Sequence, residues 1–268
     1  MSAAPEPFVT IDIELTNRCN ASCYFCPRDQ TPHQGLMSAE VFDQALVRAI
    51  EFREACQELH GRDDVRISLC GLGEPLLNPR AADAVRKVKD AGFDCVMSSN
   101  GSVLDERKAT ALLDAGLDAM NINVGDHDDE YEEIYKLPFD KTLRNVVRFN
   151  ELAGDDCKTS IVLVDYRRDR AHIKEMVQYW KTHGLHRFVF FDIMNRGGAL
   201  FVDDMQFESS PYVASAKTLL NDKGGHALCA APFVFLFIGY DGNYYLCCSD
   251  WKKEVALGTV FELSLIHI

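Results

Sequence analysis

The chain has 268 residues, with 28 Lys and Arg against 41 Asp and Glu, which gives a formal net charge of −13. Apolar residues make up 47% and charged residues 26%, the balance of an ordinary globular protein with a large core. The negative charge argues against a general nucleic-acid or anionic-membrane surface, because both partners are polyanions. We therefore expect neither nucleic acid nor membrane among its partners.

Ten cysteines are many for this length, and either extracellular disulfides or intracellular metal and redox chemistry would explain them. The N-terminal segment lacks the basic stretch followed by an apolar stretch that marks a secretory signal peptide. The longest apolar run near the C terminus, residues 230–238, contains a proline and is too short to span a bilayer. We therefore predict a cytoplasmic protein whose cysteines do not staple the fold.

Hydrophobic periodicity predicts strands and helices in alternation up to about residue 196. Six alternations imply a parallel sheet with right-handed crossovers. A closed eight-unit barrel usually needs about 250 residues, so a doubly wound sheet or an incomplete barrel fits better. Both place active groups on the loops after the carboxyl ends of strands. The predicted strands cover 8–15, 65–70, 93–98, 117–124, 159–164 and 187–194. The first predicted helix starts after the N-cap Ser38, and the later ones cover 81–91, 105–115, 140–152 and 170–183.

The chain beyond residue 196 has a different character and predicts a division into residues 1–200 and 201–268. A polar loop leads to a predicted helix over 211–220 and a Gly-Gly break. The segment 234–246 then alternates around Asp241-Gly242, which predicts a β-hairpin. Three cysteines flank this hairpin, namely Cys229, Cys247 and Cys248.

The most specific motif is a C-x3-C-x2-C run formed by Cys19, Cys23 and Cys26 in the loop after the first predicted strand. Three thiolates this close can bind one soft metal centre. A structural zinc ion normally takes four protein ligands, and the nearest candidate for a fourth is His33. An iron–sulfur cube with three cysteine ligands would instead leave one iron open for a substrate or cofactor.

This run resembles the cluster-binding motif of the radical S-adenosylmethionine (SAM) enzymes. The resemblance implies a [4Fe–4S] cluster whose unique iron is chelated by the amino and carboxylate groups of SAM. Phe25 fills the family's aromatic position before the last cysteine and would lie near the adenine. Gly73 and Glu74 match the family's GGE motif after the second strand, with Glu74 expected to accept from the SAM ammonium.

The resemblance continues after the third and fourth strands. Ser99-Asn100-Gly101 is similar to the family's Thr-Asn-Gly turn, and Asn123 takes the place of a Ser that ends near the SAM ribose. No clear counterpart of the family's adenine-binding motif follows the fifth strand, where residues 166–170 are strongly charged. The family's partial (β/α)6 barrel agrees with the six units counted from periodicity.

The second cysteine group resembles the opening of a SPASM or "twitch" extension, which binds auxiliary [4Fe–4S] clusters. Cys229, Cys247 and Cys248, with Asp250 as a further candidate, would form this auxiliary site. The downstream cysteines of such extensions are missing, so we expect a truncated extension. Residues 266–268 are a candidate for foreign sequence. The other cysteines, Cys56, Cys70, Cys95 and Cys157, are interpreted as core residues.

The resemblance implies reductive cleavage of SAM to a 5′-deoxyadenosyl radical that removes a hydrogen atom from a substrate, with an electron donor such as flavodoxin or ferredoxin. A peptide or protein is the preferred substrate, and a small molecule such as an aminosugar is the alternative. Arg196 either contacts substrate or lies in a solvated turn, and no catalytic side chain is assigned. A non-catalytic iron–sulfur protein and a zinc-binding module are the competing classes.

Overall fold

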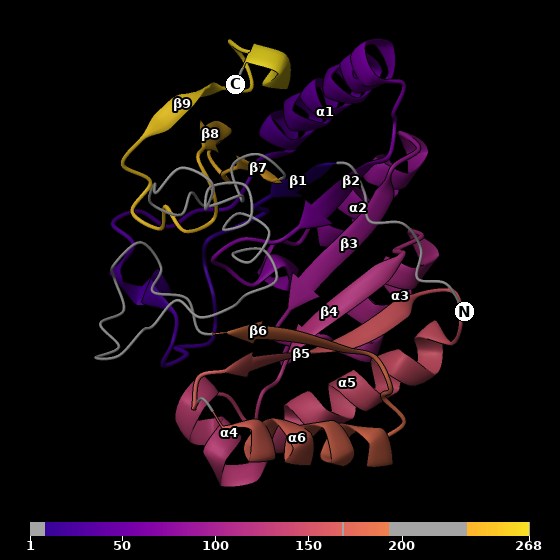
Figure 1. The fold of residues 1–268 in the computed structure, drawn as a ribbon, viewed down its shortest axis with the longest axis vertical. Coiled ribbons are helices and arrows are strands. Elements are labelled where there is room, and N and C mark those ends of the chain that lie inside the picture. The colour runs from indigo at the N-terminus through magenta and orange to yellow at the C-terminus, as the bar shows by residue number, and fades with distance from the viewer. Residues whose placement is uncertain (1–8, 168, 193–234, 268) are drawn as a thin grey trace, which may run out of the picture.

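Figure 1 shows a computed structural model of the chain, which describes residues 9–167, 169–192 and 235–267. Within these residues, nine strands form one sheet in the order β6-β5-β4-β3-β2-β1-β7-β8-β9. Its first six strands are β1 (Val9–Ile13), β2 (Val65–Leu69), β3 (Asp94–Ser99), β4 (Ala119–Asn123), β5 (Lys158–Asp165) and β6 (Phe188–Asp192). Helices connect them, namely α1 (Ala39–His60), α2 (Ala81–Asp90), α3 (Glu106–Asp114), α4 (Asp128–Tyr135), α5 (Phe139–Ala153) and α6 (Arg170–Thr182).

The first six strands are all parallel, and each pairs with the next one in sequence. The connecting helices lie along the outside of the curved sheet (Figure 1). This arrangement confirms the predicted α/β class and the partial six-unit barrel. In the described part of the chain, no helix has both the length and the apolar character needed to cross a bilayer.

The parallel register gives the sheet two chemically different faces. Ile11, Ile67 and Met120 are fully buried and join one hydrophobic cluster with residues from the helices. Their strand neighbours point to the opposite face, because side chains alternate along a strand. This opposite face, called here the concave face, carries polar side chains, namely Asp12, Ser68, Ser98, Asn121, Asn123 and Ser160.

Helix α4 was not predicted, because its sequence is dominated by acidic residues. Its apolar contribution comes from Tyr131 and Tyr135, which lie one turn apart and are both almost completely buried, and from Ile134, which is partly buried against the same core. Two tyrosines and one isoleucine among five carboxylates give little hydrophobic periodicity, so the segment resembles a loop in the sequence.

The C-terminal hairpin is confirmed, although its place in the sheet was not predicted. β7 (Phe235–Ile238) and β8 (Asn243–Tyr245) are antiparallel and turn through Asp241-Gly242, and β9 (Ala256–Thr259) continues the ladder. β7 pairs parallel with β1, so the hairpin extends the barrel sheet at its first strand. The predicted helix over 211–220 and Arg196 lie outside the described residues.

The start of α1 offers a direct test of local folding. Ser38 Oγ accepts a hydrogen bond of 3.1 Å from the Val41 amide, as an N-cap does. We expect Ser38→Ala to lower the free energy of unfolding by about 1 kcal/mol, measured by urea denaturation. Ser38→Asp keeps an acceptor and should retain the stability, whereas equal losses in both variants would contradict the capping role.

Candidate functional site

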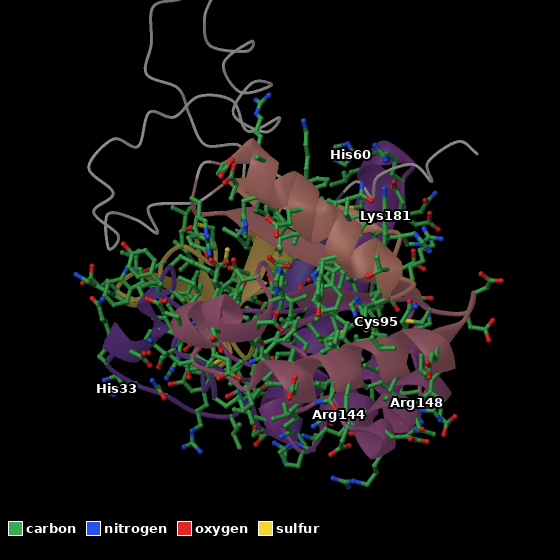
Figure 2. The ribbon with its side chains drawn as sticks, turned by 90° about the horizontal axis from the view of Figure 1, so that it is seen from below. His33, His60, Cys95, Arg144, Arg148 and Lys181 are labelled. Carbon is green, nitrogen blue, oxygen red and sulfur yellow. The ribbon has the colours of Figure 1, made fainter. Side chains whose placement is uncertain are left out.

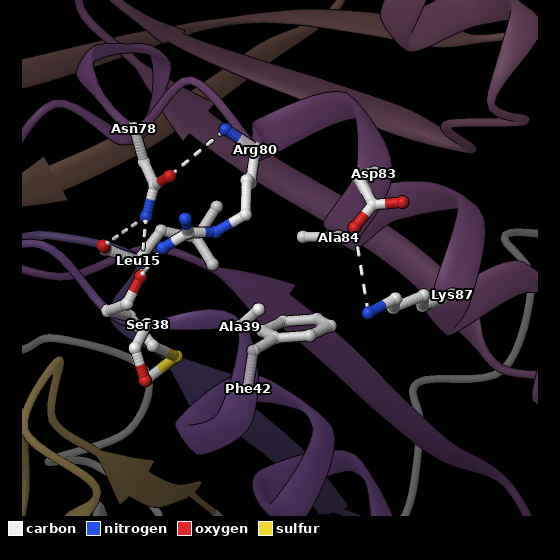
Figure 3. Close-up of a pocket in the computed structure, with 10 residues that line it drawn as sticks. Leu15, Ser38, Ala39, Phe42, Asn78, Arg80, Asp83, Ala84 and Lys87 are labelled. Atoms are coloured by element: carbon white, nitrogen blue, oxygen red, sulfur yellow. Dashed lines mark hydrogen bonds and ion pairs between the residues drawn. The ribbon is translucent and has the colours of Figure 1, made fainter.

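The cysteine loop, residues 16–36, follows β1, and the residues on either side of it lie next to each other. The Met37 amide donates to the Leu15 carbonyl at 2.9 Å. Figure 3 shows two side chains at this closure, seen from the pocket between α1 and α2. Asn78 Nδ2 donates to the carbonyls of Leu15 and Met37, at 2.9 and 3.2 Å, and Arg80 donates to Met37 at 2.6 Å. The segment after β2 therefore holds both ends of the cysteine loop.

Cys19, Cys23 and Cys26 are brought together on this loop, and all three are half-buried. The Ala21 amide donates to Cys19 Sγ at 3.4 Å, and Asn100 Nδ2 lies 3.8 Å from the same sulfur. Hydrogen bonds to ligand sulfurs are one of the means by which proteins set the potential of an iron–sulfur cluster. Asn100, which was noted as a turn residue but not as a site residue, therefore belongs to the site.

The three thiols do not have the spacing of a preformed zinc site. A tetrahedral zinc with bonds of about 2.3 Å brings its sulfur ligands to about 3.8 Å from each other. Among the described residues, no three cysteine sulfurs lie within 4.8 Å of one another. His33, the nearest candidate for a fourth ligand, is exposed and lies at the edge of the molecule (Figure 2).

Burial raises the pKa of the Cys19 and Cys23 thiols, and charge on the neighbouring cysteines raises it further. The two thiols are therefore neutral unless a positive centre removes their protons. A bound metal centre supplies such a charge and deprotonates coordinating thiols. The donor set therefore fits an iron–sulfur cluster.

Gly73 makes the close approach between the loop after β2 and the cysteine loop. A Cβ atom at this position would overlap the Thr16 and Arg18 carbonyl oxygens, so only glycine fits without a shift of either backbone. The Glu74 amide donates to the Arg18 carbonyl at 2.8 Å and fixes the contact. Gly73, which matches the family's GGE motif, thus lies directly against the cysteine loop.

The Glu74 carboxylate connects the second and third loops. Its Oε1 accepts from the Leu76 amide at 3.1 Å and from Ser99 Oγ at 2.9 Å, and its Oε2 accepts from the Asn100 amide at 2.7 Å. Burial raises the pKa of Glu74, and these three donors partly oppose the rise. The side chain is almost fully buried and bonded within the chain, so its contact with a SAM ammonium stays a prediction.

Phe25 is held between two tyrosines from later elements. Its ring is perpendicular to Tyr135 at 5.6 Å and stacks on Tyr166 at 5.8 Å between centroids. Tyr166, directly after β5, donates to Asp126 Oδ2 at 2.7 Å. The end of the fifth strand, where no family motif was found, therefore supports the aromatic residue of the cysteine loop.

Asp126 is the centre of a buried polar cluster that the sequence analysis missed. Its Oδ1 lies 2.9 Å from both Arg167 and His172, and burial raises the pKa of its carboxyl group. Asp126, Glu130 and His172 are close enough for metal ligation, but Arg167 pairs with both carboxylates and opposes a cation there. The one sequence feature that pointed to this cluster was the charged segment after β5. It has no apolar periodicity, so the sequence did not indicate which residues it would contact.

Cys70 is not a core residue, unlike Cys56, Cys95 and Cys157, which are buried in the hydrophobic cluster. It follows β2 on the concave face, where its thiol lies 3.2 Å from Asp12 Oδ1 and 3.2 Å from Ser68 Oγ. The interpretation of this residue as core was therefore wrong. Asn123 is half-buried on the same face, at the end of β4.

The auxiliary candidates Cys247 and Cys248 are half-buried and follow β8. Burial raises the pKa of the Cys70 thiol, and charge on Cys248 adds to this rise. Cys248, in the extension, is therefore near enough to Cys70 on the concave face to affect its ionisation. The Asp250 carboxylate instead accepts from the amides of Glu254 and Val255, at 3.3 and 3.5 Å. Cys229 lies outside the described residues.

Comparisons with known families identify the class of protein that this site serves. A model of the Radical SAM superfamily matches residues 13–190, and a model of the SPASM iron–sulfur cluster-binding domain matches residues 229–268. The first match spans about two thirds of the chain, so the chain belongs to the radical SAM superfamily. Members use a [4Fe–4S] cluster and SAM, and SPASM domains bind auxiliary iron–sulfur clusters. The predicted family and its cofactors are confirmed.

Curated relatives have diverse names. The chain is 31% identical over 159 residues to a tungsten-containing aldehyde ferredoxin oxidoreductase cofactor-modifying protein of Pyrococcus furiosus, covering 59% of the chain and 38% of the relative. It is 30% identical over 187 residues to GTP 3′,8-cyclase of Limosilactobacillus fermentum, covering 68% of the chain and 53% of the relative. The chain thus spans about half the length of the curated relatives it matches.

Solved structures show the same fold at low sequence identity. SuiB of Streptococcus suis bound to SAM superposes with a TM-score of 0.69 at 14% identity, covering 97% of this chain and 64% of SuiB. The enzyme anSMEcpe with bound SAM gives 0.67 at 16% identity, covering 96% and 79%. BtrN in complex with SAM and 2-DOIA gives 0.57 at 16% identity, covering 98% and 82%.

Asp12 on the concave face should make the free energy of unfolding depend on pH, and a substitution of this residue should remove that dependence. Burial raises the pKa of Asp12 from 3.8 to about 6. Because the folded state holds this proton more tightly, the associated stability is present below about pH 4 and is lost as the pH rises through 6. The loss corresponds to about 3 kcal/mol.

We therefore expect wild type to lose about 2 kcal/mol more unfolding free energy than Asp12→Asn between pH 4 and pH 7, which is most of this total. Urea denaturation of the apoprotein at several pH values measures the difference. Parallel pH profiles of the two proteins would show that Asp12 titrates normally.

Proposed function

We propose that the chain is a radical SAM enzyme in which Cys19, Cys23 and Cys26 bind the [4Fe–4S] cluster and the loop containing Gly73 and Glu74 binds SAM. The observation that carries this assignment is the packing of that loop directly on the cysteine loop. When bound, these cofactors supply a 5′-deoxyadenosyl radical that removes a hydrogen atom from a substrate C–H bond. Cleavage of SAM requires one electron, for which a flavodoxin or ferredoxin is the proposed donor.

The chain's own residues then have definite positions around this centre. Asn100 donates toward the Cys19 sulfur, and Tyr166 supports the Phe25 ring beside the adenine site. Ser99 is buried and binds Glu74, so we propose that it acts on SAM through that carboxylate. Asn123 ends β4 on the concave face, where we place the SAM ribose and the substrate.

We propose a peptide or protein as the substrate. The support is the similarity of fold to two enzymes crystallised with peptides, SuiB with its precursor peptide SuiA and anSMEcpe with the Cp18Cys peptide. A small polar molecule is the second candidate, because the fold also matches BtrN, whose complex contains 2-DOIA. The hydroxyl, amide and carboxyl groups of the concave face suit either substrate.

Two further assignments are part of this proposal. Residues 1–200 form the radical SAM core, and residues 201–268 form the auxiliary-cluster region with Cys229, Cys247 and Cys248 as ligands. The protein works in the reducing cytoplasm, because its N-terminal motif needs three reduced thiols, and Cys19, Cys23 and Cys26 form no disulfide.

The assignment is tested by anaerobic reconstitution with iron and sulfide, followed by SAM and dithionite. We expect wild type to release 5′-deoxyadenosine and Cys23→Ala to lose it by at least about 100-fold, because a metal-centre ligand is removed. Chromatography of the quenched reaction measures the product.

Cys56→Ala is the matched control, because this cysteine is buried in α1 and should leave cleavage unchanged. A wild-type protein that binds iron and sulfide but never cleaves SAM would indicate a non-catalytic iron–sulfur protein. A colourless protein containing zinc would indicate the zinc-binding module.

The auxiliary site is tested by counting iron. Two [4Fe–4S] clusters correspond to about eight iron atoms per chain, and one cluster corresponds to about four. We expect Cys247→Ala to lower the iron content toward about four while 5′-deoxyadenosine formation remains measurable. A wild-type content of about four iron atoms, unchanged in Cys247→Ala, would contradict an auxiliary cluster.

A further inference from the structure

Glu14 follows β1 and has no solvent exposure, although it carries a carboxylate. Oε1 accepts from the Leu72 amide at 3.0 Å, and Oε2 accepts from the Tyr240 amide at 3.3 Å. A side chain at Gly71 would overlap Glu14, so the two segments are in direct contact. One buried carboxylate therefore joins the loop before Gly73 to the turn of the C-terminal hairpin.

The cationic partner of Glu14 is Lys253, which comes from the segment after Cys247 and Cys248. Its Nζ lies 2.8 Å from Glu14 Oε2. The rings of Phe237, Tyr240 and Tyr245 surround the ammonium at 5.0, 5.8 and 4.4 Å from their centroids. Three aromatic faces within about 6 Å favour a cation at this position.

Lys253 is also held in an unusual backbone conformation. Its φ is +57°, in the left-handed region that is unfavourable for a non-glycine residue. The cost persists only where the surrounding structure determines it, and here the ion pair and the aromatic rings do so. The neighbouring Lys252 is exposed, where it pairs with Glu254 at 3.6 Å and lies 5.4 Å from the centroid of the Trp251 ring.

A second contact connects the same hairpin to the cysteine loop. The Tyr240 ring packs so closely on Gly35 that a Cβ atom there would overlap it. Gly35 is in turn fixed within the cysteine loop, because its amide donates to Asn17 Oδ1 at 2.8 Å and its carbonyl accepts from Thr16 Oγ1. The hairpin thus contacts the loop that the proposed function assigns to the cluster directly, and the loop assigned to SAM through Glu14.

We propose that Glu14, Lys253 and Tyr240 form a clamp through which the C-terminal extension fixes the position of the SAM-binding loop. Lys253 neutralises and orients Glu14, Glu14 holds the Leu72 amide, and Leu72 precedes the Gly73 contact with the cysteine loop. These are positioning residues, since they act through Leu72 and Gly73. The inference rests on the proposed function for its consequence, although the clamp itself is a property of the protein without cofactors.

The clamp is tested first without SAM, by hydrogen–deuterium exchange of the full-length apoprotein. We expect Lys253→Met to accelerate exchange at the Leu72 and Glu74 amides by about tenfold. This factor is at the lower end of what the loss of a charge-assisted interaction produces. Amides of Ile67 and Met97, in the neighbouring core strands, should keep their wild-type rates. Lys252→Met is the matched control and should change neither loop.

Two further variants keep this test decisive. Lys253→Arg retains the charge and should restore most of the protection at Leu72. If Lys253→Met does not fold, Lys253→Gln takes its place, because its side chain is polar while the charge is absent. Wild-type exchange at Leu72 in the neutral variant, or equal acceleration throughout the core, would overturn the clamp.

SAM binding to the reconstituted chain then tests the consequence. We expect Lys253→Met to weaken SAM binding by about tenfold, as followed by the SAM-induced change in the electron paramagnetic resonance spectrum of the reduced cluster. Lys252→Met should bind SAM as wild type does. A wild type that fails to bind SAM would refute the proposed function, whereas equal binding by wild type and Lys253→Met would refute the coupling alone.

Discussion

The structure depends on the position of β1 between two parallel partners. β2 pairs with it on one side and β7 on the other, so both hydrogen-bonding edges of β1 are occupied. The cysteine loop, the loop after β2 and the turn of the hairpin consequently leave the sheet beside each other, because parallel strands have their carboxyl ends at one edge. The extension is therefore connected to the proposed cofactor site through the first strand of the barrel, and Glu14 lies between the loop after β2 and the turn of the hairpin.

The second constraint is that three irregular loops must pack closely without leaving buried backbone groups unpaired. Glycine permits the approach at two places, Gly73 against the cysteine loop and Gly35 against Tyr240. Side chains then satisfy the backbone, with Asn78 binding carbonyl groups at the loop base and Glu74 accepting two amides. The two loops that we propose for the cluster and SAM are thus held in place by contacts within the chain itself.

Buried charge follows the same division of the sheet into two faces. The helix side has an apolar cluster, whereas the concave side holds Asp12 beside Cys70, and the carboxyl edge holds Glu14 and Asp126. Glu14 and Asp126 have cationic partners, whereas the neighbours of Asp12 are the Cys70 thiol and the Ser68 hydroxyl, and burial raises its pKa to about 6. The charge of Asp12 therefore depends on pH near neutrality.

The sequence by itself determined the alternation of strands and helices, the N-cap at Ser38 and the cysteine loop after β1, because periodicity, capping and cysteine spacing are local properties. Only the tertiary structure placed β7 beside β1, Tyr166 against Phe25 and Cys70 on the concave face. The Tyr240 amide and Glu14 are 226 positions apart, and Lys253 reaches the same carboxylate. A contact between two residues so far apart produces no periodic pattern in the sequence, because it forms only when complete strands and loops pack against each other.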